Sequence, residues 1–298
     1  MLKKLIIALI IIVTVLVSCS PYPGQTHAPT IYIVSVGLDY LNSEAPDLVG
    51  CPDDALEFGS CLSDIYRQRG FEAKTSYLVQ YSAEADKAAR DYPMADAILG
   101  AISGIPSTED DLIIFYYSGH GDVDENGNAF LAAGSETGDY EELPMAAVFS
   151  ALETKKAPAV AVIDACYSGA MAEEGGKSIW EAFASLFSRL DLRSVKVIAA
   201  SGSDELSYMV PVFTESGEQE SHGALTASIL EILGWRHTSI NTRTVLVSGC
   251  EKTVYGTVGY SNQSITADEL FEELSGNWRY YEQTPTTNQI PVDIMLLN

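Results

Sequence analysis

Two short apolar runs, each followed at once by small and reactive residues, constrain this chain more than any other feature. Leu112 to Tyr116 leads into Tyr117-Ser118-Gly119-His120-Gly121, and Ala159 to Ile163 leads into Asp164-Ala165-Cys166-Tyr167-Ser168-Gly169. A short apolar run that ends in turn residues is typical of a buried strand in a parallel sheet. The loops that follow neighbouring parallel strands meet at one edge of the sheet, where ligands bind. We therefore expect the His120 imidazole and the Cys166 thiol to lie close together.

A thiol beside an imidazole is the arrangement of a cysteine nucleophile and its base. The reactive species is the thiolate, and a neighbouring histidine favours it over a thiol whose unperturbed pKa is about 8.5. Each motif alone also fits a simpler interpretation, in which glycine-flanked polar residues end a strand and a buried cysteine fills space. The occurrence of both motifs at one sheet edge favours the catalytic pair.

Alternating apolar strands and amphipathic helices predict the fold class. This alternation indicates right-handed crossovers and an α/β, three-layer sandwich with a mostly parallel central sheet. The expected strands are 31–36, 73–79, 112–117, 159–163, 195–200 and one within 290–297, and the expected helices are 52–69, 94–102, 144–152, 223–233 and 266–274.

The two motifs also resemble those of the caspase and metacaspase peptidases of the caspase-haemoglobinase fold. Ser-Gly-His-Gly around His120 and the apolar strand before Asp-Ala-Cys-Tyr-Ser-Gly both match, and 46 residues separate His120 from Cys166. In caspases the histidine precedes the cysteine by about 50 residues. Asp164 stands two residues before the cysteine, as in metacaspases and their bacterial relatives. The resemblance, over roughly residues 30 to 235, implies a caspase-like fold and a cysteine endopeptidase.

The resemblance implies a role for each motif residue. His120 would take the proton of Cys166, or lie beside its thiolate, and later protonate the leaving amine, while Cys166 attacks a peptide carbonyl. The backbone N–H groups of Gly121 and Cys166 would form the oxyanion hole. Ser201, after the fifth expected strand, lies in a segment similar to the one that binds the substrate backbone.

A first specificity pocket for Arg or Lys is also implied by the resemblance. Its lining residues would be Cys51, Asp54, Ser118 and Asp164. A purely structural role remains open for both acids. Asp54 would be favoured in the first turn of a helix, and Asp164 could hold the amides of a loop. Caspases that bind substrate Asp use arginines, and this sequence has none beside either motif, so we expect basic rather than acidic specificity.

A function of a different class is the alternative: a noncatalytic caspase-like module that binds a cationic peptide or partner at the cell envelope. Tyr167, beside the proposed nucleophile, stands where bacterial relatives commonly carry histidine. The same acidic pocket would serve either function.

We expect no required cofactor and no metal among the site residues. Residues 122–128 copy the first half of a calcium loop, but its twelfth position is Ala133 instead of the bidentate glutamate. Calcium binding and an acidic hairpin turn both remain open for this segment.

The N-terminus has the pattern of a secretory signal. Lys3 and Lys4 precede an apolar run from Leu5 to Val17 that only Thr14 interrupts, shorter than the roughly 20 apolar residues of a spanning helix. Leu16-Val17-Ser18-Cys19 resembles the lipobox of bacterial lipoproteins, in which the segment before the cysteine is removed and the cysteine is acylated. An ordinary signal peptide or a short anchor is the alternative.

These features predict the organisation and location of the chain. We expect a lipoprotein-type signal peptide over 1–18, lipidation at Cys19, a tether over 19–30 and one peptidase domain over 31–298. The protein would then lie at the bacterial cell envelope, anchored to the membrane by its lipid and facing outward from the cytoplasm.

Charge and cysteine content limit the partners. With 17 Lys and Arg against 41 Asp and Glu, the formal net charge is −24, which repels nucleic acid and favours cationic peptide or protein partners. A solvated acidic face is the simpler account. Of the five cysteines, Cys19 is the proposed lipid site and Cys166 the proposed nucleophile, and we expect Cys51, Cys61 and Cys250 to be thiols.

Residues 170–193, between the fourth and fifth expected strands, correspond to the cleavable activation linker of caspases. We favour an insertion or a plain crossover helix over processing. Lys177, Arg189 and Arg193 are the basic sites at which self-cleavage would occur.

Overall fold

The computed structural model describes most of the chain after the N-terminal segment. The described residues are 28–41, 43, 45–80, 93–135, 140–167, 192–200, 209–213, 219–235, 238–247, 250–256, 264–280, 283–291 and 293–297. The predicted signal peptide, the lipid site at Cys19, Ser201 and nearly all of the predicted linker lie outside them. Within these ranges, no helix is both long and apolar enough to cross a membrane.

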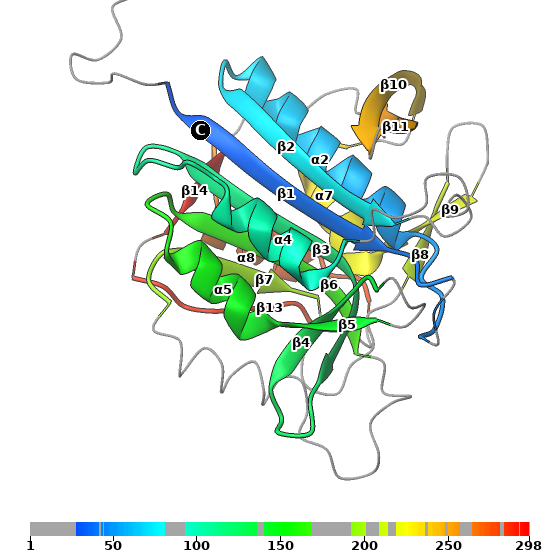
Figure 1. The fold of residues 1–298 in the computed structure, drawn as a ribbon. Coiled ribbons are helices and arrows are strands. Elements are labelled where there is room, and N and C mark those ends of the chain that lie inside the picture. Colours follow the sequence, from blue (N-terminus) through cyan, green and yellow to red (C-terminus); the bar gives the residue numbers. More distant parts are fainter. Residues whose placement is uncertain are drawn as a thin grey trace, which may run out of the picture.

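A mainly parallel sheet forms the centre of the molecule (Figure 1). Neighbouring strands are parallel from β2 to β7, and β13 pairs antiparallel with β7 at the edge. The β4–β5 hairpin adds antiparallel pairs to the end of β3. In spatial order the strands are β13 (Thr286–Thr287), β7 (Val195–Ala199), β6 (Ala159–Tyr167), β3 (Leu112–Val123), β1 (Thr30–Leu38) and β2 (Glu72–Gln80), with β4 (Ala129–Ala133) and β5 (Glu141–Pro144) attached to β3.

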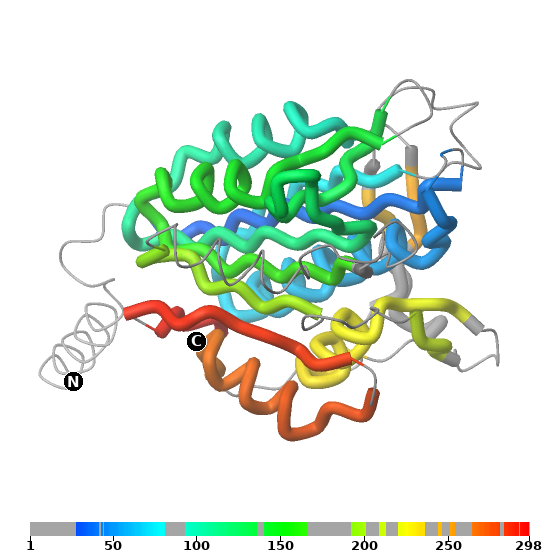
Figure 2. Tube along the Cα trace, turned by 90° about the horizontal axis from the view of Figure 1, so that it is seen from below, coloured from blue at the N-terminus to red at the C-terminus, as the bar shows by residue number. Residues whose placement is uncertain are grey.

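Helices cover both faces of this sheet, as Figures 1 and 2 show. One face carries α4 (Ala95–Ser103) and α5 (Met145–Glu153). The other carries α2 (Cys51–Gln68), α7 (Ala224–Ile232) and α8 (Ala267–Asn277). The α/β fold with a mostly parallel central sheet and helices on both faces is therefore confirmed.

Three small antiparallel pairs lie outside the central sheet, and the sequence analysis did not predict them. The predicted last strand within 290–297 forms only over its final three residues, and it pairs with β12 instead of the central sheet. The pairs are β8 (Met209–Phe213) with β9 (Gln219–Gly223), β10 (Thr238–Val247) with β11 (Cys250–Gly256), and β12 (Ile265–Thr266) with β14 (Met295–Leu297).

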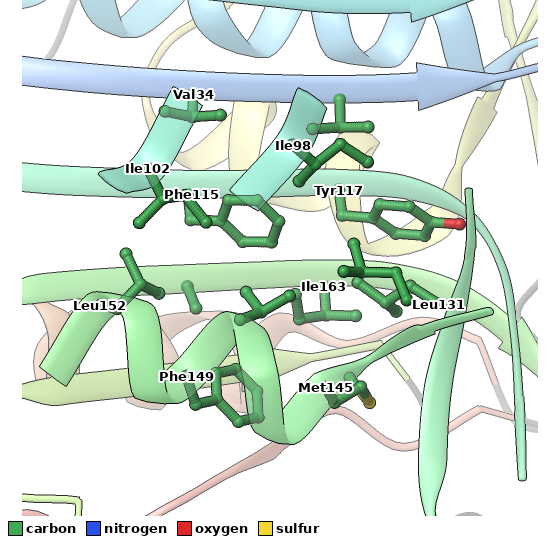
Figure 3. Packing of buried hydrophobic residues seen from close by; sticks show 14 of the residues in the cluster. Val34, Ile98, Ile102, Phe115, Tyr117, Leu131, Met145, Phe149, Leu152 and Ile163 are labelled. Atoms are coloured by element: carbon green, nitrogen blue, oxygen red, sulfur yellow. The ribbon is translucent and has the colours of Figure 1, made fainter. Parts of the chain in front are cut away.

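Strand β3 explains why the sheet needs both helical layers. Its odd residues Ile113, Phe115 and Tyr117 pack toward α4 and α5, whereas its even residues pack toward α2 and α7. Figure 3 shows the first of these two cores, with Phe115 and Tyr117 facing the helices. Because successive strand residues point to opposite faces, a continuous apolar run is buried only between two layers.

The two motif strands are longer than the sequence predicted. The predicted strands end at Tyr117 and Ile163, but β3 continues through His120 to Val123 and β6 continues through Cys166 to Tyr167. We expected turns directly after the two apolar runs, and this expectation was wrong. The strands continue because β3 pairs with β6 on one side and with β4 on the other. Pairing with these strands keeps the backbone extended beyond the apolar runs.

The order of connections marks the sheet edge where a ligand would bind. After β1 the chain passes through α2 to β2 on one side, and β3 returns to the other side of β1. Ligands of open α/β sheets bind at the carboxyl ends of the strands beside such a reversal. The end of β1, the His120 motif and the Cys166 motif all lie at this edge.

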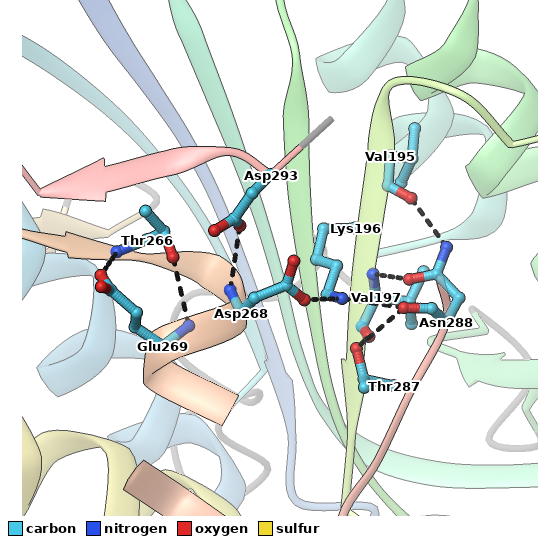
Figure 4. A network of polar contacts seen from close by, with 9 residues as sticks. All are labelled: Val195, Lys196, Val197, Thr266, Asp268, Glu269, Thr287, Asn288 and Asp293. Atoms are coloured by element: carbon cyan, nitrogen blue, oxygen red, sulfur yellow. Dashed lines mark hydrogen bonds and ion pairs between the residues drawn. The ribbon is translucent and has the colours of Figure 1, made fainter. Parts of the chain in front are cut away.

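A polar network lies along the outer side of β7, at the end of the strand order that β13 forms (Figure 4). Asn288 accepts a hydrogen bond from the backbone N–H of Val197 at 2.8 Å and donates to the Val195 carbonyl at 2.9 Å. The fully buried ammonium group of Lys196 donates to the Asn288 carbonyl at 2.8 Å and pairs with Asp268 of α8. The Asn288 side chain thus replaces a neighbouring strand along β7.

Asn288→Ala is expected to lower the free energy of unfolding by about 2–4 kcal/mol, because two buried backbone groups of β7 lose their partner. Urea denaturation measures this change. Asn277→Ala, at an exposed position of α8, is the matched control and should change the stability by no more than about 0.5 kcal/mol. Equal effects of the two variants would contradict the role assigned to Asn288.

Candidate active site

The imidazole of His120 is held in one tautomer at the carboxyl edge of the sheet. Its Nε2 lies 2.6 Å from the carbonyl oxygen of Pro46, and because a carbonyl only accepts, Nε2 carries the hydrogen. Its Nδ1 is buried and has no hydrogen-bond partner among the residues that the structure describes. Burial lowers the pKa of His120, against smaller opposing effects of the Pro46 hydrogen bond and the Asp122 charge. The ring is therefore neutral near pH 7, with an Nδ1 lone pair available.

Tyr40 supports His120 from the chain segment that follows β1. Its hydroxyl accepts a hydrogen bond from the His120 backbone N–H at 3.1 Å and donates to the Ala132 carbonyl at 2.6 Å. The two rings lie 4.6 Å apart at a 45° tilt. A Cβ at Gly119 would come within 2.6 Å of this hydroxyl, so the motif needs glycine there.

Sequence reasoning missed both Tyr40 and Pro46. Tyr40 lies just past the carboxyl end of β1, at the same edge as the two motifs. The rule that ligands bind at this edge would have identified it. Pro46 contributes only its backbone carbonyl, for which a single sequence offers no signal.

Cys166 is the register partner of His120 across β3 and β6. Neighbouring strands run about 4.8 Å apart, so the two backbones are adjacent at these positions. The structure describes the backbone of Cys166, and its thiol lies outside the described atoms. A Cβ at the neighbouring Gly121 would meet the Ala165 Cβ at 3.2 Å, so a side chain there would be crowded by β6.

Asp54 of α2 is fully buried and accepts three hydrogen bonds. The donors are the Ser118 hydroxyl at 3.0 Å, the His222 Nδ1–H at 2.7 Å and the Gly223 backbone N–H at 2.9 Å. Gly223 is the N-cap of α7, where a carboxylate is stabilised by the helix dipole. Two of the predicted pocket residues, Asp54 and Ser118, are thus in direct contact.

Asp164 of β6 lies against the same helix start. One of its oxygens accepts hydrogen bonds from the Thr226 backbone N–H at 2.9 Å and from the Thr226 hydroxyl at 2.6 Å. A Cβ at Gly223 would lie only 2.2 Å from this oxygen. Asp164 therefore binds an amide of the first turn of α7, whereas the ordinary account had expected it to hold the amides of a loop.

The predicted pocket residues gather around the first turns of α2 and α7. Cys51 is the first residue of α2 and is buried, as are Asp54, Ser118 and Asp164. Gly223 contacts both acids, which relates them in space. Their internal hydrogen bonds link the pocket to α7 and to β9, two elements that sequence analysis did not connect with it.

The acidic segment after His120 forms the β3–β4 hairpin turn. Asp124 accepts hydrogen bonds from the backbone of Asn126 at 2.8 Å and from the backbone and side chain of Asn128 at 2.7 and 2.8 Å. These bonds hold the pKa of Asp124 below its usual value. The turn has a sufficient structural explanation, and calcium binding there stays a prediction.

The structure describes the side chains of two of the three cysteines that we expected to be thiols. Cys51 and Cys61 are both buried in α2 and form no disulfide. This confirms the expectation for these two residues.

The fold and this sheet edge define an α/β protein whose reactive motifs end two adjacent parallel strands. A family model described as the caspase domain, of peptidase family C14, matches residues 36–289. The chain belongs to the caspase domain family, which is a family of cysteine peptidases that act on peptide or protein substrates. No curated protein shows a significant match to the chain.

Tyr40→Phe is expected to destabilise the protein by about 1–3 kcal/mol, because the buried N–H of His120 loses its acceptor. Urea denaturation measures the change. Tyr32→Phe, a buried tyrosine of β1 whose hydroxyl takes no part in these contacts, serves as the control and should cost less. If both variants are equally stable, Tyr40 does not support His120 in the way described.

Proposed function

We propose that this protein is a cysteine endopeptidase that cleaves after Arg or Lys through Cys166 and His120. One observation carries the proposal: a buried, neutral imidazole, fixed by the Pro46 carbonyl, lies in register with Cys166. Register partners in neighbouring strands share a face of the sheet. The His120 Nδ1, which carries no hydrogen in this tautomer, is the acceptor that a thiol proton needs.

The chemical steps follow from this tautomer. Nδ1 of His120 takes the Cys166 proton, and the thiolate attacks the peptide carbonyl carbon. The imidazolium then protonates the amine as the C–N bond breaks. Water, deprotonated by the same nitrogen, hydrolyses the acyl-enzyme and restores the thiol. The Pro46 carbonyl stabilises the imidazolium through its bond with Nε2–H.

Backbone N–H groups of Gly121 and Cys166 would bind the oxyanion in this mechanism. Loss of one such donor costs on the order of 2.7–4 kcal/mol of transition-state stabilisation in known enzymes. Ser201 would bind the substrate backbone.

Preference for a basic side chain would come from Cys51, Asp54, Ser118 and Asp164. Both carboxylates are buried and bonded within the chain. Binding of a guanidinium or ammonium group therefore requires that the acids exchange part of these bonds for the substrate. The excess of 41 acidic over 17 basic residues favours cationic substrates over nucleic acid.

The location is part of the same proposal. Removal of residues 1–18 and acylation of Cys19 would anchor the peptidase to a bacterial membrane, facing outward from the cytoplasm, through the tether 19–30. Its partners would be peptides or proteins at the cell envelope.

The first test is hydrolysis of fluorogenic peptides that end in Arg, Lys or Asp by the full chain in mild detergent, with and without calcium. We expect turnover of the Arg and Lys peptides that disappears in Cys166→Ala and persists in Cys250→Ala, the matched cysteine control. Turnover of Asp peptides would overturn the pocket assignment. Binding of cationic peptides without turnover under any condition would instead favour the noncatalytic module.

The acid limb of kcat/KM should lie below pH 6.5, because burial lowers the pKa of His120 and the neutral base persists to lower pH. The Asp122 charge raises this pKa, so Asp122→Asn should move the limb to still lower pH. Glu125→Gln, an exposed charge in the same hairpin turn, should leave it unchanged. A limb that moves upward in Asp122→Asn would contradict the assignment of His120 as the base.

A further inference from the structure

Three side chains converge on one buried point between α2 and the β8–β9 hairpin. His222 Nε2 lies 3.6 Å from an oxygen of Glu57 and 3.8 Å from an oxygen of Glu220. The three ligand atoms all lie within 4.8 Å of one another. His222 and Glu57 are buried, whereas the Glu220 side chain is 28% exposed. Glu220 therefore connects the point to solvent.

Asp54 determines which nitrogen of His222 faces this point. The Nδ1 of His222 donates to Asp54 at 2.7 Å, so in the neutral ring Nε2 carries a lone pair. Nε2 is buried and makes no hydrogen bond to the residues that the structure describes. It is directed at two carboxylates, which are also acceptors when ionised, so either a proton on Nε2 or a metal ion must lie between them. Burial lowers the pKa of His222, but the polar contacts with Asp54 and Glu220 and the nearby carboxylate charges raise it well above its usual value overall, so protonated His222 is the alternative to a metal ion.

The spacing fits a tetrahedral metal ion. Zinc binds imidazole nitrogen and carboxylate oxygen at about 2.0–2.2 Å, which separates neighbouring tetrahedral ligands by about 3.4 Å. The 3.6 and 3.8 Å separations at His222 need only small adjustments. The Asp54–His222 hydrogen bond also has the form of a carboxylate that orients a metal-binding histidine.

The local charge also calls for a cation. Glu57 is buried, and the carboxylates of Glu220 and Asp54 lie close enough to act on its charge. A buried carboxylate is stabilised by a proton, a paired charge or a metal ion. A divalent ion at this point would offset two of the negative charges.

We propose that Glu57, Glu220 and His222 form a Zn²⁺ site that joins α2 to β9, with Asp54 as the positioning residue behind His222. The ring nitrogen favours zinc over calcium or magnesium, which take oxygen ligands. Three protein ligands leave the fourth position for water on the Glu220 side. The ion would fix the hairpin that carries His222 against the helix that carries Asp54, and so control how the predicted pocket opens.

The test is zinc binding by the full chain in detergent, in a Cys166→Ala background that removes the proposed nucleophilic thiol. After treatment with a chelator and its removal, Zn²⁺ is titrated against a chromophoric competitor. We expect one tightly bound ion per chain. Glu57→Gln and His222→Ala should weaken binding on the order of 100-fold or more, and Asp54→Asn by about 10- to 100-fold. Asp53→Asn, an exposed acid on the same helix, is the matched control.

Thermal unfolding separates loss of the site from loss of the fold. Zn²⁺ should raise the melting temperature of the Cys166→Ala chain, and this rise should vanish in Glu220→Gln, whose partly exposed position tolerates the change. Absence of zinc binding, or binding that Glu57→Gln and Glu220→Gln leave intact, would overturn the site and leave a proton-sharing cluster in its place. Neither readout depends on peptidase activity, so the two proposals fail independently.

Discussion

The parallel pairing of β3 with β6 is the constraint on which the rest of the structure depends. Both strands are buried along their apolar runs, so each face of the strands needs a covering layer of helices. The motif residues His120, Asp164 and Cys166 follow only where the strands reach the sheet edge. Their register brings His120 opposite Cys166 and Ser118 opposite Asp164. A shift of one residue would turn the motif side chains to the other face.

The first turn of α7 holds two buried carboxylates of the candidate site in place. It supplies two backbone N–H groups, from Gly223 and Thr226, to the buried carboxylates of Asp54 and Asp164. Hydrogen bonds and the helix dipole reduce the cost of burying these charges. The residues proposed to select a basic substrate are therefore also structural, and substrate binding would be coupled to the position of α7 and β9.

The main helices and central strands were predictable because their periodicity is strong. Predicted helices 52–69 and 94–102 agree with α2 and α4 to within a residue or two, since proline and acids begin α2 and Gly70, at φ 86°, follows its end. The hairpins β8–β9 and β10–β11 were not predicted. The second strand of each hairpin, Gln219–Gly223 or Cys250–Gly256, contains mostly polar or mixed residues and no apolar run, so strand propensity alone does not identify it.

By itself, the sequence determined the α/β class, the five parallel strands of the central sheet and the presence of a histidine and a cysteine at one sheet edge, because burial dictates apolar periodicity and parallel strands share an edge. It did not predict β4, β5 and β13, which complete the sheet. Only the tertiary structure decided the His120 tautomer, the support from Tyr40 and the contact of His222 with Asp54. These depend on a backbone carbonyl and on side chains from as far as 168 residues away. No local pattern encodes such distances, because packing of the whole chain sets them.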